Sequence, residues 1–125
     1  MEDTLKKSRV DRSRELAMKI AEIIFSKKGK DVLLLHLHEV ADFTDFFLIC
    51  SADSTTQVDA LSDEIVKKLK KQGFFPHHME GKEALSWVLI DYLDVIVHIM
   101  LPETRSLYQI EKLWGDVTRE EVYGD

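Results

Sequence analysis

Two aspartates on either side of a predicted turn are the first candidates for chemistry. Asp91 and Asp94 stand three positions apart between two apolar runs, so their carboxylates could approach each other. A nucleotidyltransferase uses such a pair to hold Mg²⁺, usually as Asp-x-Asp on one strand behind a Gly-Ser turn, but Ser51-Ala52-Asp53 lacks the glycine. Aspartates also form turns through their side chains. Turn formation is the favoured interpretation, and a metal-dependent nucleotidyltransferase-like enzyme using Asp91 and Asp94 is the alternative function.

Histidines and the single cysteine could also serve as ligands or catalytic groups. His36 and His38 lie two residues apart on a predicted strand, so they share a face that could bind metal, but the sequence indicates no third ligand nearby. His98 lies in a buried strand without a neighbouring nucleophile. Cys50 has no disulfide partner and fits as a small buried apolar residue. We therefore expect no catalytic residue, no metal and no cofactor, and we predict that the protein is not an enzyme.

Charge is divided unevenly along the 125 residues. Residues 1–30 carry nine Lys and Arg against five Asp and Glu, a net charge of +4, whereas residues 31–125 carry eight against eighteen, a net charge of −10. An acidic body repels phosphate, so nucleic-acid binding would depend on the basic arm or on the lysines within 67–71. A solvated helix face is the simpler explanation of those lysines. We expect a basic protein partner and no sequence-specific nucleic acid.

The positions of apolar residues and of turn residues predict the elements that would carry these side chains. In order, they are a helix over 8–28, strands over 32–38 and 45–50, a helix that opens with a capping box at Ser54 and ends at Gly73, a strand over 74–79, strands over 87–90 and 95–100, and a helix from Pro102 to Gly115. The apolar stripe of the first helix is Leu16, Ile20, Ile23 and Ile24, and that of the last helix is Leu107, Ile110, Leu113 and Trp114. This order predicts one domain over 1–125 with an α/β fold, a single mixed sheet of about five strands covered by helices. We expect residues 1–9 and 116–125 to be flexible.

The two apolar runs from Trp87 to Met100 predict a hairpin at the centre of the sheet, because neither run alternates with polar residues. Aromatic and acidic residues gather around it. Trp87 and Tyr92 could anchor a protein interface whose rim carboxylates pair with cations of the partner. The same two aromatic residues could equally belong to the core, and spacing alone leaves both possibilities open.

Neither a membrane span nor a secretion signal is indicated. No apolar run reaches the roughly 18 residues that a span needs. The first seven residues, Met-Glu-Asp-Thr-Leu-Lys-Lys, lack a signal-peptide apolar segment. We therefore expect a cytoplasmic protein with no membrane partner.

Several short motifs occur together in a defined order. They are Thr44-Asp45-Phe46-Phe47, Gln57-Val58 with Ala60-Leu61, Glu80-Gly81, the run from Trp87 to His98, and Arg105 with Tyr108 and Glu111-Lys112-Leu113-Trp114. Each motif is weak by itself. The ordered set, over residues 10 to 116, resembles the ribosomal silencing factor family, also called the Iojap-like family.

The resemblance implies a small α/β protein, usually a homodimer, with a fold similar to nucleotidyltransferases but without their catalytic residues. It implies a translational repressor that binds the large ribosomal subunit through ribosomal protein fourteen, sterically blocks joining of the small subunit and lowers translation under nutrient limitation. The residues carried over to this partner surface are Trp87, Val88, Ile90, Asp91, Tyr92, His98 and Met100. Strand alternation sets Val88 and Ile90 opposite Trp87, Leu89 and Asp91, so part of the carried-over set must be core. The last predicted helix, with Tyr108 and Trp114, is a candidate dimer interface.

Overall fold

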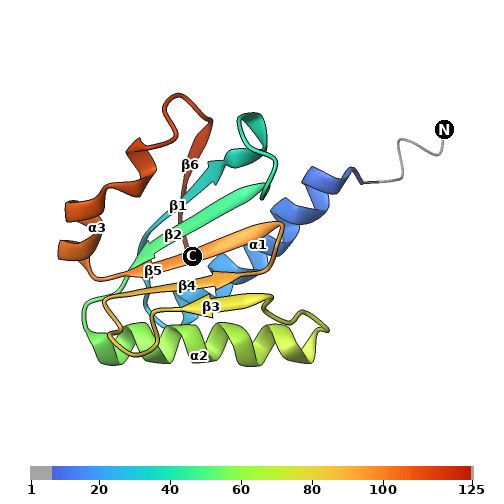
Figure 1. The fold of residues 1–125 in the computed structure, drawn as a ribbon. Coiled ribbons are helices and arrows are strands. Elements are labelled where there is room, and N and C mark those ends of the chain that lie inside the picture. The colour runs from blue at the N-terminus through green and yellow to red at the C-terminus, as the bar shows by residue number, and fades with distance from the viewer. Residues whose placement is uncertain (1–6, 125) are drawn as a thin grey trace.

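The computed structural model describes residues 7–124 (Figure 1). Within them the chain forms one six-stranded mixed sheet in the order β3-β4-β5-β2-β1-β6. The helices are α1 (Arg9–Ser26), η2 (Leu37–Glu39), α2 (Thr55–Lys71), α3 (Pro102–Tyr108) and η3 (Ile110–Lys112), where η denotes a 3-10 turn. The strands are β1 (Lys30–His36), β2 (Phe46–Ser51), β3 (His78–Glu80), β4 (Trp87–Asp91), β5 (Val95–Met100) and β6 (Arg119–Val122). The predicted α/β fold is confirmed, with six strands in place of about five. In this part of the chain no helix has the length and apolar character to cross a bilayer.

The hairpin predicted at the centre of the sheet is present. β4 and β5 run antiparallel, with Trp87 opposite Met100 and Asp91 opposite Ile96. β5 also pairs in parallel with β2, and every residue of β5 and β2 is buried. In the turn, Leu93 has a φ of 71° and donates its N–H to Asp91 Oδ1 at 2.7 Å. Asp91 therefore holds the turn, the interpretation that the sequence favoured.

α1 begins at a capping box and ends close to β1. Asp11 donates its N–H to Ser8 Oγ at 3.0 Å, and Ser8 donates its own N–H to the Asp11 carboxylate. Of the arm predicted to be flexible over 1–9, residues 1–6 lie outside the described residues. Gly29 follows the helix, and a Cβ there would lie 2.2 Å from Ile24 Cγ2. Glycine is required because β1 starts so close to α1.

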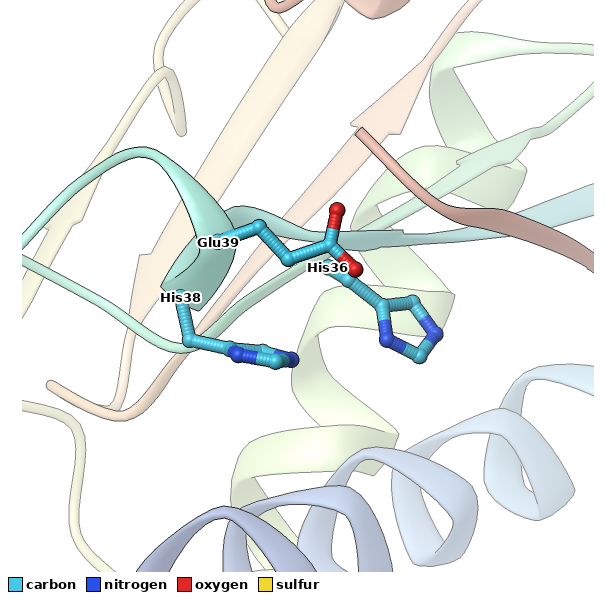
Figure 2. A group of neighbouring side chains, drawn as sticks. All are labelled: His36, His38 and Glu39. Atoms are coloured by element: carbon cyan, nitrogen blue, oxygen red, sulfur yellow. The ribbon is translucent and has the colours of Figure 1, made fainter. Parts of the chain in front are cut away.

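β1 ends earlier than the pattern of its residues predicts. His36 is the last strand residue, and the chain then turns into η2. The turn brings Glu39 beside His36 and His38 (Figure 2), with one possible ligand atom from each of the three lying within 4.8 Å of the others. The expectation that no third ligand type lies near the two histidines is therefore wrong. The sequence pattern missed it because a continuous strand would have pointed Glu39 to the opposite face.

The sixth strand comes from the polar tail. β6 pairs antiparallel with β1, with Glu120 opposite Leu34. Its residues alternate between exposed and half-buried, as suits an edge strand. Glu120 accepts from Arg14 Nη2 at 2.6 Å, and His36 Nε2 lies 2.6 Å from its other carboxylate oxygen. The tail was predicted to be flexible over 116–125, but these contacts and the pairing with β1 hold residues 119–122 in place. The polar composition of the tail gives no sign of them.

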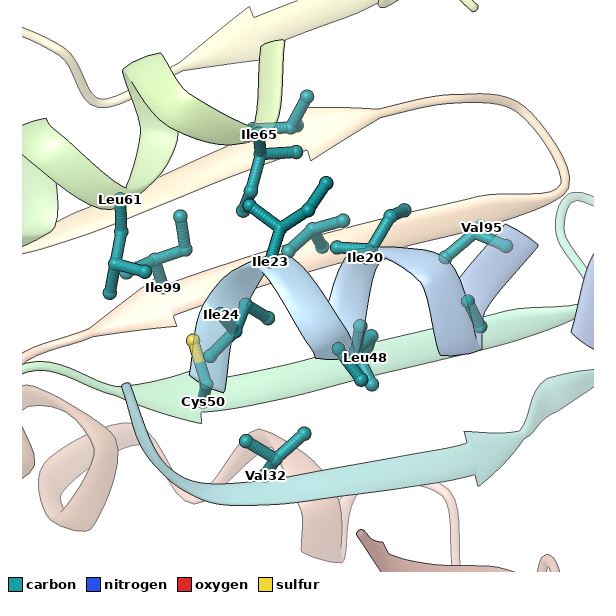
Figure 3. Close-up of a cluster of buried hydrophobic side chains, with 14 of the residues drawn as sticks. Ile20, Ile23, Ile24, Val32, Leu48, Cys50, Leu61, Ile65, Val95 and Ile99 are labelled. Carbon is teal, nitrogen blue, oxygen red and sulfur yellow. The ribbon is translucent and has the colours of Figure 1, made fainter. Parts of the chain in front are cut away.

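The main core lies between the sheet and helices α1 and α2 (Figure 3). Aliphatic side chains from both helices meet those of β1, β2 and β5. Members of this core are Ile20, Ile23, Ile24, Val32, Leu48, Cys50, Leu61, Ile65, Val95 and Ile99. Burial raises the pKa of the Cys50 thiol to about 12. Cys50 is therefore protonated and packs as an apolar residue, as predicted.

The last helix is shorter than predicted. α3 ends at Tyr108 because Gln109 takes a left-handed conformation with a φ of 44°. η3 follows, and Ile110 within it is buried on the sheet. Leu107 and Leu113, expected on the buried stripe, are 75% and 72% exposed. α3 and η3 lie on the sheet face opposite α1 and α2 (Figure 1) and cover it only in part.

Candidate functional site

Aromatic rings form a continuous line on the sheet face opposite α1 and α2. The ring centroids of Tyr108 and Trp87 are 5.2 Å apart, and those of Trp87 and His98 are 6.0 Å apart. Phe47 lies 4.5 Å from His98 and 5.7 Å from Trp114. We call this line, with Phe43 at its end, the aromatic row; its members are Phe43, Phe47, Trp87, His98, Tyr108 and Trp114.

The order of the strands places the middle of the row. Trp87 is on β4, His98 on β5 and Phe47 on β2, three neighbouring strands of the sheet. Alternation along each strand turns these three side chains to the same face. Two connecting segments extend the row: α3 brings Tyr108 over Trp87, and the segment after η3 brings Trp114 over Phe47. The row therefore combines side chains of residues 43–47 with side chains of residues 87–114, two stretches that are distant in sequence.

His98 is the buried polar group of the row. Its Nδ1 accepts the indole N–H of Trp87 at 3.1 Å. Burial lowers the pKa of His98 to about 4, so the imidazole is neutral near pH 7. Because the indole nitrogen only donates, the imidazole proton must be on Nε2, which has no hydrogen-bond partner among residues 7–124. His98 thus fixes the orientation of Trp87 without carrying a charge.

Large apolar side chains around the row are open to solvent. Tyr108 is 56% exposed and Phe43 is 56% exposed, at opposite ends of the row. Leu107 and Leu113, each next to a row residue in the chain, are exposed further. Trp87 is half-buried, as is Leu89 on the same face of β4. Exposed apolar side chains gathered in this way are typical of a protein-binding surface.

The structure divides the seven residues that the motif placed at the partner surface. Trp87 and Asp91 are half-exposed on the face of the row. His98 and Met100 lie on the same face but are buried within it. Val88, Ile90 and Tyr92 belong to the core beneath α1 and α2. Burial also raises the pKa of the Tyr92 hydroxyl to about 12. These three side chains support the strand and turn and offer little or no surface to a partner.

Sequence reasoning missed several members of the patch. Phe47 lies in the predicted strand over 45–50, with no face assigned to it, and Phe43 lies in the connection before that strand. Leu89 was recognised only as facing opposite to Val88. The signal available was the alternation of β2 and β4, which puts Phe47 and Leu89 on the face of Trp87 once the helix-covered face is known.

The alternative enzyme finds no support in the geometry of the two aspartates. Asp91 accepts the N–H of Leu93 in the turn, and Asp94 is exposed. Among residues 7–124, the side chains close enough to share a metal do not include either of them. Ser51, in the segment compared with a nucleotidyltransferase turn, is buried and accepts from Arg105 Nη1 at 3.0 Å. These contacts are structural.

Comparison with known proteins decides the family. The family model described as ribosomal silencing factor during starvation matches residues 10–124. The chain belongs to this family. The resemblance drawn from the sequence motifs is thereby confirmed. Ribosomal silencing factors are named for a regulatory activity and not for a catalytic one.

Individual ribosomal silencing factors and a solved structure agree with this assignment. The chain is 38% identical over 112 residues to ribosomal silencing factor RsfS of Halalkalibacterium halodurans, covering 90% of this chain and 96% of that protein. It is 40% identical over 90 residues to RsfS of Bacillus subtilis, covering 72% and 76%. A crystal structure of a protein from Chromobacterium violaceum superposes with a TM-score of 0.77 at 33% identity, covering 94% of this chain and 95% of that one.

Proposed function

We propose that the protein represses translation by binding the large ribosomal subunit and blocking the small subunit from joining. The proposed contact is ribosomal protein fourteen of the large subunit, and the proposed setting is nutrient limitation in the cytoplasm. The family of this chain supports a ribosomal partner. The observation that carries the binding surface is the aromatic row, whose exposed ends leave a patch of apolar side chains uncovered.

The physical character of the patch suits a protein partner. Trp and Tyr bury large rigid surfaces at low entropic cost, and Trp87 and Tyr108 lie in contact at one end of the row. Carboxylates border them: Asp91 lies on the same face of β4, and Glu80 on β3 is opposite Leu89. Ribosomal proteins are rich in Lys and Arg side chains because they bind RNA. An acidic rim around an apolar centre would complement such a partner and repel bare phosphate.

The proposed ribosome surface and the predicted dimer surface overlap. Tyr108 and Trp114 were assigned to a dimer interface and Trp87 to the ribosome, yet Tyr108 touches Trp87 and all three belong to one row. A dimer that buried Tyr108 and Trp114 would also cover Trp87. We propose that the ribosomal partner occupies the row and that any homodimer formed through it must dissociate first.

Co-sedimentation tests the proposal directly. The purified protein is centrifuged with large subunits, small subunits and joined ribosomes, and it should pellet with large subunits and reduce the fraction of joined ribosomes. Trp87→Ala should weaken binding about 30- to 1,000-fold, the equivalent of about 2–4 kcal/mol for an aromatic anchor. Tyr108→Ala should weaken it as well, and its exposed side chain can be removed without opening the core.

A matched control is available on the opposite edge of the sheet. Tyr123 follows β6 and is 78% exposed, and its hydroxyl donates to Glu121. Tyr123→Ala should bind large subunits as the unchanged protein does. Circular dichroism and thermal melting establish that each variant is folded. Undiminished binding by folded Trp87→Ala and Tyr108→Ala proteins would remove the row from the proposal, and absence from every ribosomal fraction would end the proposal itself.

A further inference from the structure

A second cluster of side chains, which could act as metal ligands, lies away from the aromatic row. His36 ends β1, and His38 and Glu39 follow in η2, with one possible ligand atom from each lying within 4.8 Å of the others. Figure 2 shows the three side chains directed into one common space beside α1. Both imidazole rings pack against Phe46, at centroid distances of 5.1 and 5.4 Å. Because Phe46 belongs to the core under α1 and α2, the cluster is on the opposite face of the sheet from the row.

His36 is already oriented by a second carboxylate. Its Nε2 lies 2.6 Å from Glu120 Oε2, and Glu120 is held in turn by Arg14 through Nη2 at 2.6 Å. A proton on Nε2 that is donated to Glu120 leaves the lone pair of Nδ1 available. Metal-binding histidines usually have this arrangement, in which the second ring nitrogen donates to a carboxylate and fixes the ring.

His38 supplies an independent sign of a ligand. Its Nε2 is buried and has no hydrogen-bond partner among residues 7–124. Buried polar atoms are nearly always paired, and an unpaired one in a native protein points to a water or an ion. The Glu39 side chain is exposed, and it accepts the N–H of Thr118 at 2.8 Å. Because the side chain is exposed, turning Glu39 toward the two rings would disturb no packing; the carboxylate would exchange its hydrogen bond to Thr118 for the ion.

We propose that His36 Nδ1, His38 Nε2 and the Glu39 carboxylate bind a divalent cation of the zinc class. Two imidazoles and a carboxylate are a ligand set that zinc accepts, and three protein ligands leave a fourth position for water or for a group of a partner molecule. Zinc–ligand distances of about 2.0–2.2 Å require the three ligand atoms to approach to roughly 3.4 Å of each other. Side-chain rotation of Glu39 and His38 provides that approach. The ion would tie the end of β1 to η2, and through Glu120 to β6.

Calorimetric titration of the untagged full chain with Zn²⁺ alone tests the site. One ion should bind per chain, and Co²⁺ in its place should give the visible absorption bands of a four-coordinate ion. A Zn²⁺ concentration 100 times the Kd should raise the melting temperature by about 10 °C, because the ion binds only the folded chain. Glu120→Gln should weaken binding about 10- to 100-fold, since it removes the carboxylate charge that orients His36 and leaves the three proposed ligands in place.

Two variants separate this site from adventitious binding. His38→Ala and Glu39→Gln should each abolish one-to-one binding, and Glu39→Gln leaves the core untouched because its side chain is exposed. His78→Ala is the matched control: His78 is an exposed histidine that pairs with Glu80 on β3 at the far edge of the sheet. Its removal should change nothing. Failure of the unchanged protein to bind Zn²⁺, or binding that survives both His38→Ala and Glu39→Gln, would overturn the proposal.

Discussion

Protonation of His98 should couple the stability of the protein to pH. The pKa of this imidazole lies at about 4, below the ordinary value of 6.5, because the side chain is buried between Trp87 and Phe47. As the pH falls, the unfolded chain takes up the proton first, so protonation favours unfolding. The contribution of His98 to stability is therefore complete above about pH 6.5 and is lost progressively down to about pH 4.

The magnitude follows from the two pKa values. With 6.5 for the unfolded chain and about 4 for the folded one, linkage gives a loss of about 2 kcal/mol between pH 7.5 and pH 5. The limit below pH 4 is about 3 kcal/mol. Charging His98 costs stability for two reasons: the imidazolium would lose its hydration in the buried site, and its Nδ1–H would face the indole N–H of Trp87, donor against donor.

Urea denaturation of the unchanged protein and of His98→Gln measures this effect. The glutamine amide oxygen can accept the Trp87 N–H but does not titrate, so the variant keeps the polar contact and removes the proton site. Between about pH 7.5 and about pH 5, the free energy of unfolding of the unchanged protein should fall about 2 kcal/mol further than that of the variant. Other titrating groups affect both proteins equally and cancel in the difference. An identical pH dependence in the two proteins would refute the reasoning.

Three further predictions concern groups outside the row. Asp45→Ala should lower the free energy of unfolding by about 2–4 kcal/mol in urea, because the buried Asp45 carboxylate accepts from Ser13 Oγ at 2.6 Å; a change below about 1 kcal/mol would contradict this. Gly29→Ala should cost about 1–3 kcal/mol by the same measurement, because its Cβ would clash with Ile24, and unchanged stability would show that β1 can shift. Cys50 should react with an aromatic disulfide reagent only at the rate of unfolding, and rapid labelling of the native protein would disprove its burial.

The spacing of apolar residues correctly predicted the helices that have one continuous buried face. The stripe predicted on the first helix, Leu16 with Ile20, Ile23 and Ile24, is buried in α1. The second helix begins after Ser54, whose Oγ accepts the N–H of Gln57 at 3.1 Å, the first of the two hydrogen bonds of the predicted capping box. The second bond differs from the prediction, because Gln57 Oε1 accepts the N–H of Asp53 at 2.6 Å and not that of Ser54. These features depend on neighbours within a few residues along the chain. Local sequence therefore determines them, whatever the rest of the fold does.

The same reasoning failed at the last helix for a physical reason. Leu107 and Leu113 recur at helical spacing with Ile110, and the pattern predicted one buried stripe. In the structure Ile110 packs on the sheet while the two leucines face solvent. An apolar stripe that binds a partner has the same spacing as one that packs in the core. Only the position of the chain after Gln109 distinguishes the two.

The sequence predicted some residues of the candidate site but left open which of them face a partner and which belong to the core. Alternation along β4 separates Trp87 from Val88, but it does not say which of the two faces the helices. That information comes from α1 and α2, whose own apolar stripes must be buried against one face of the sheet. Tyr108 reaches Trp87 only because the chain turns after α3. Contacts between distant segments, and not any local pattern, make the row a surface.

Alternate side chains of β4 face opposite sides of the sheet, and this explains how the fold can leave apolar side chains uncovered. Val88 and Ile90 fill the core beneath the helices, so the fully buried side chains of β4 lie on that face. Trp87 and Leu89, on the other face, are half-buried and contribute less to folding. Exposing their remaining apolar surface to water costs free energy. The free protein tolerates this because the main core is complete without these two side chains. A partner that covers the row removes this apolar surface from water, so the hydrophobic effect favours binding.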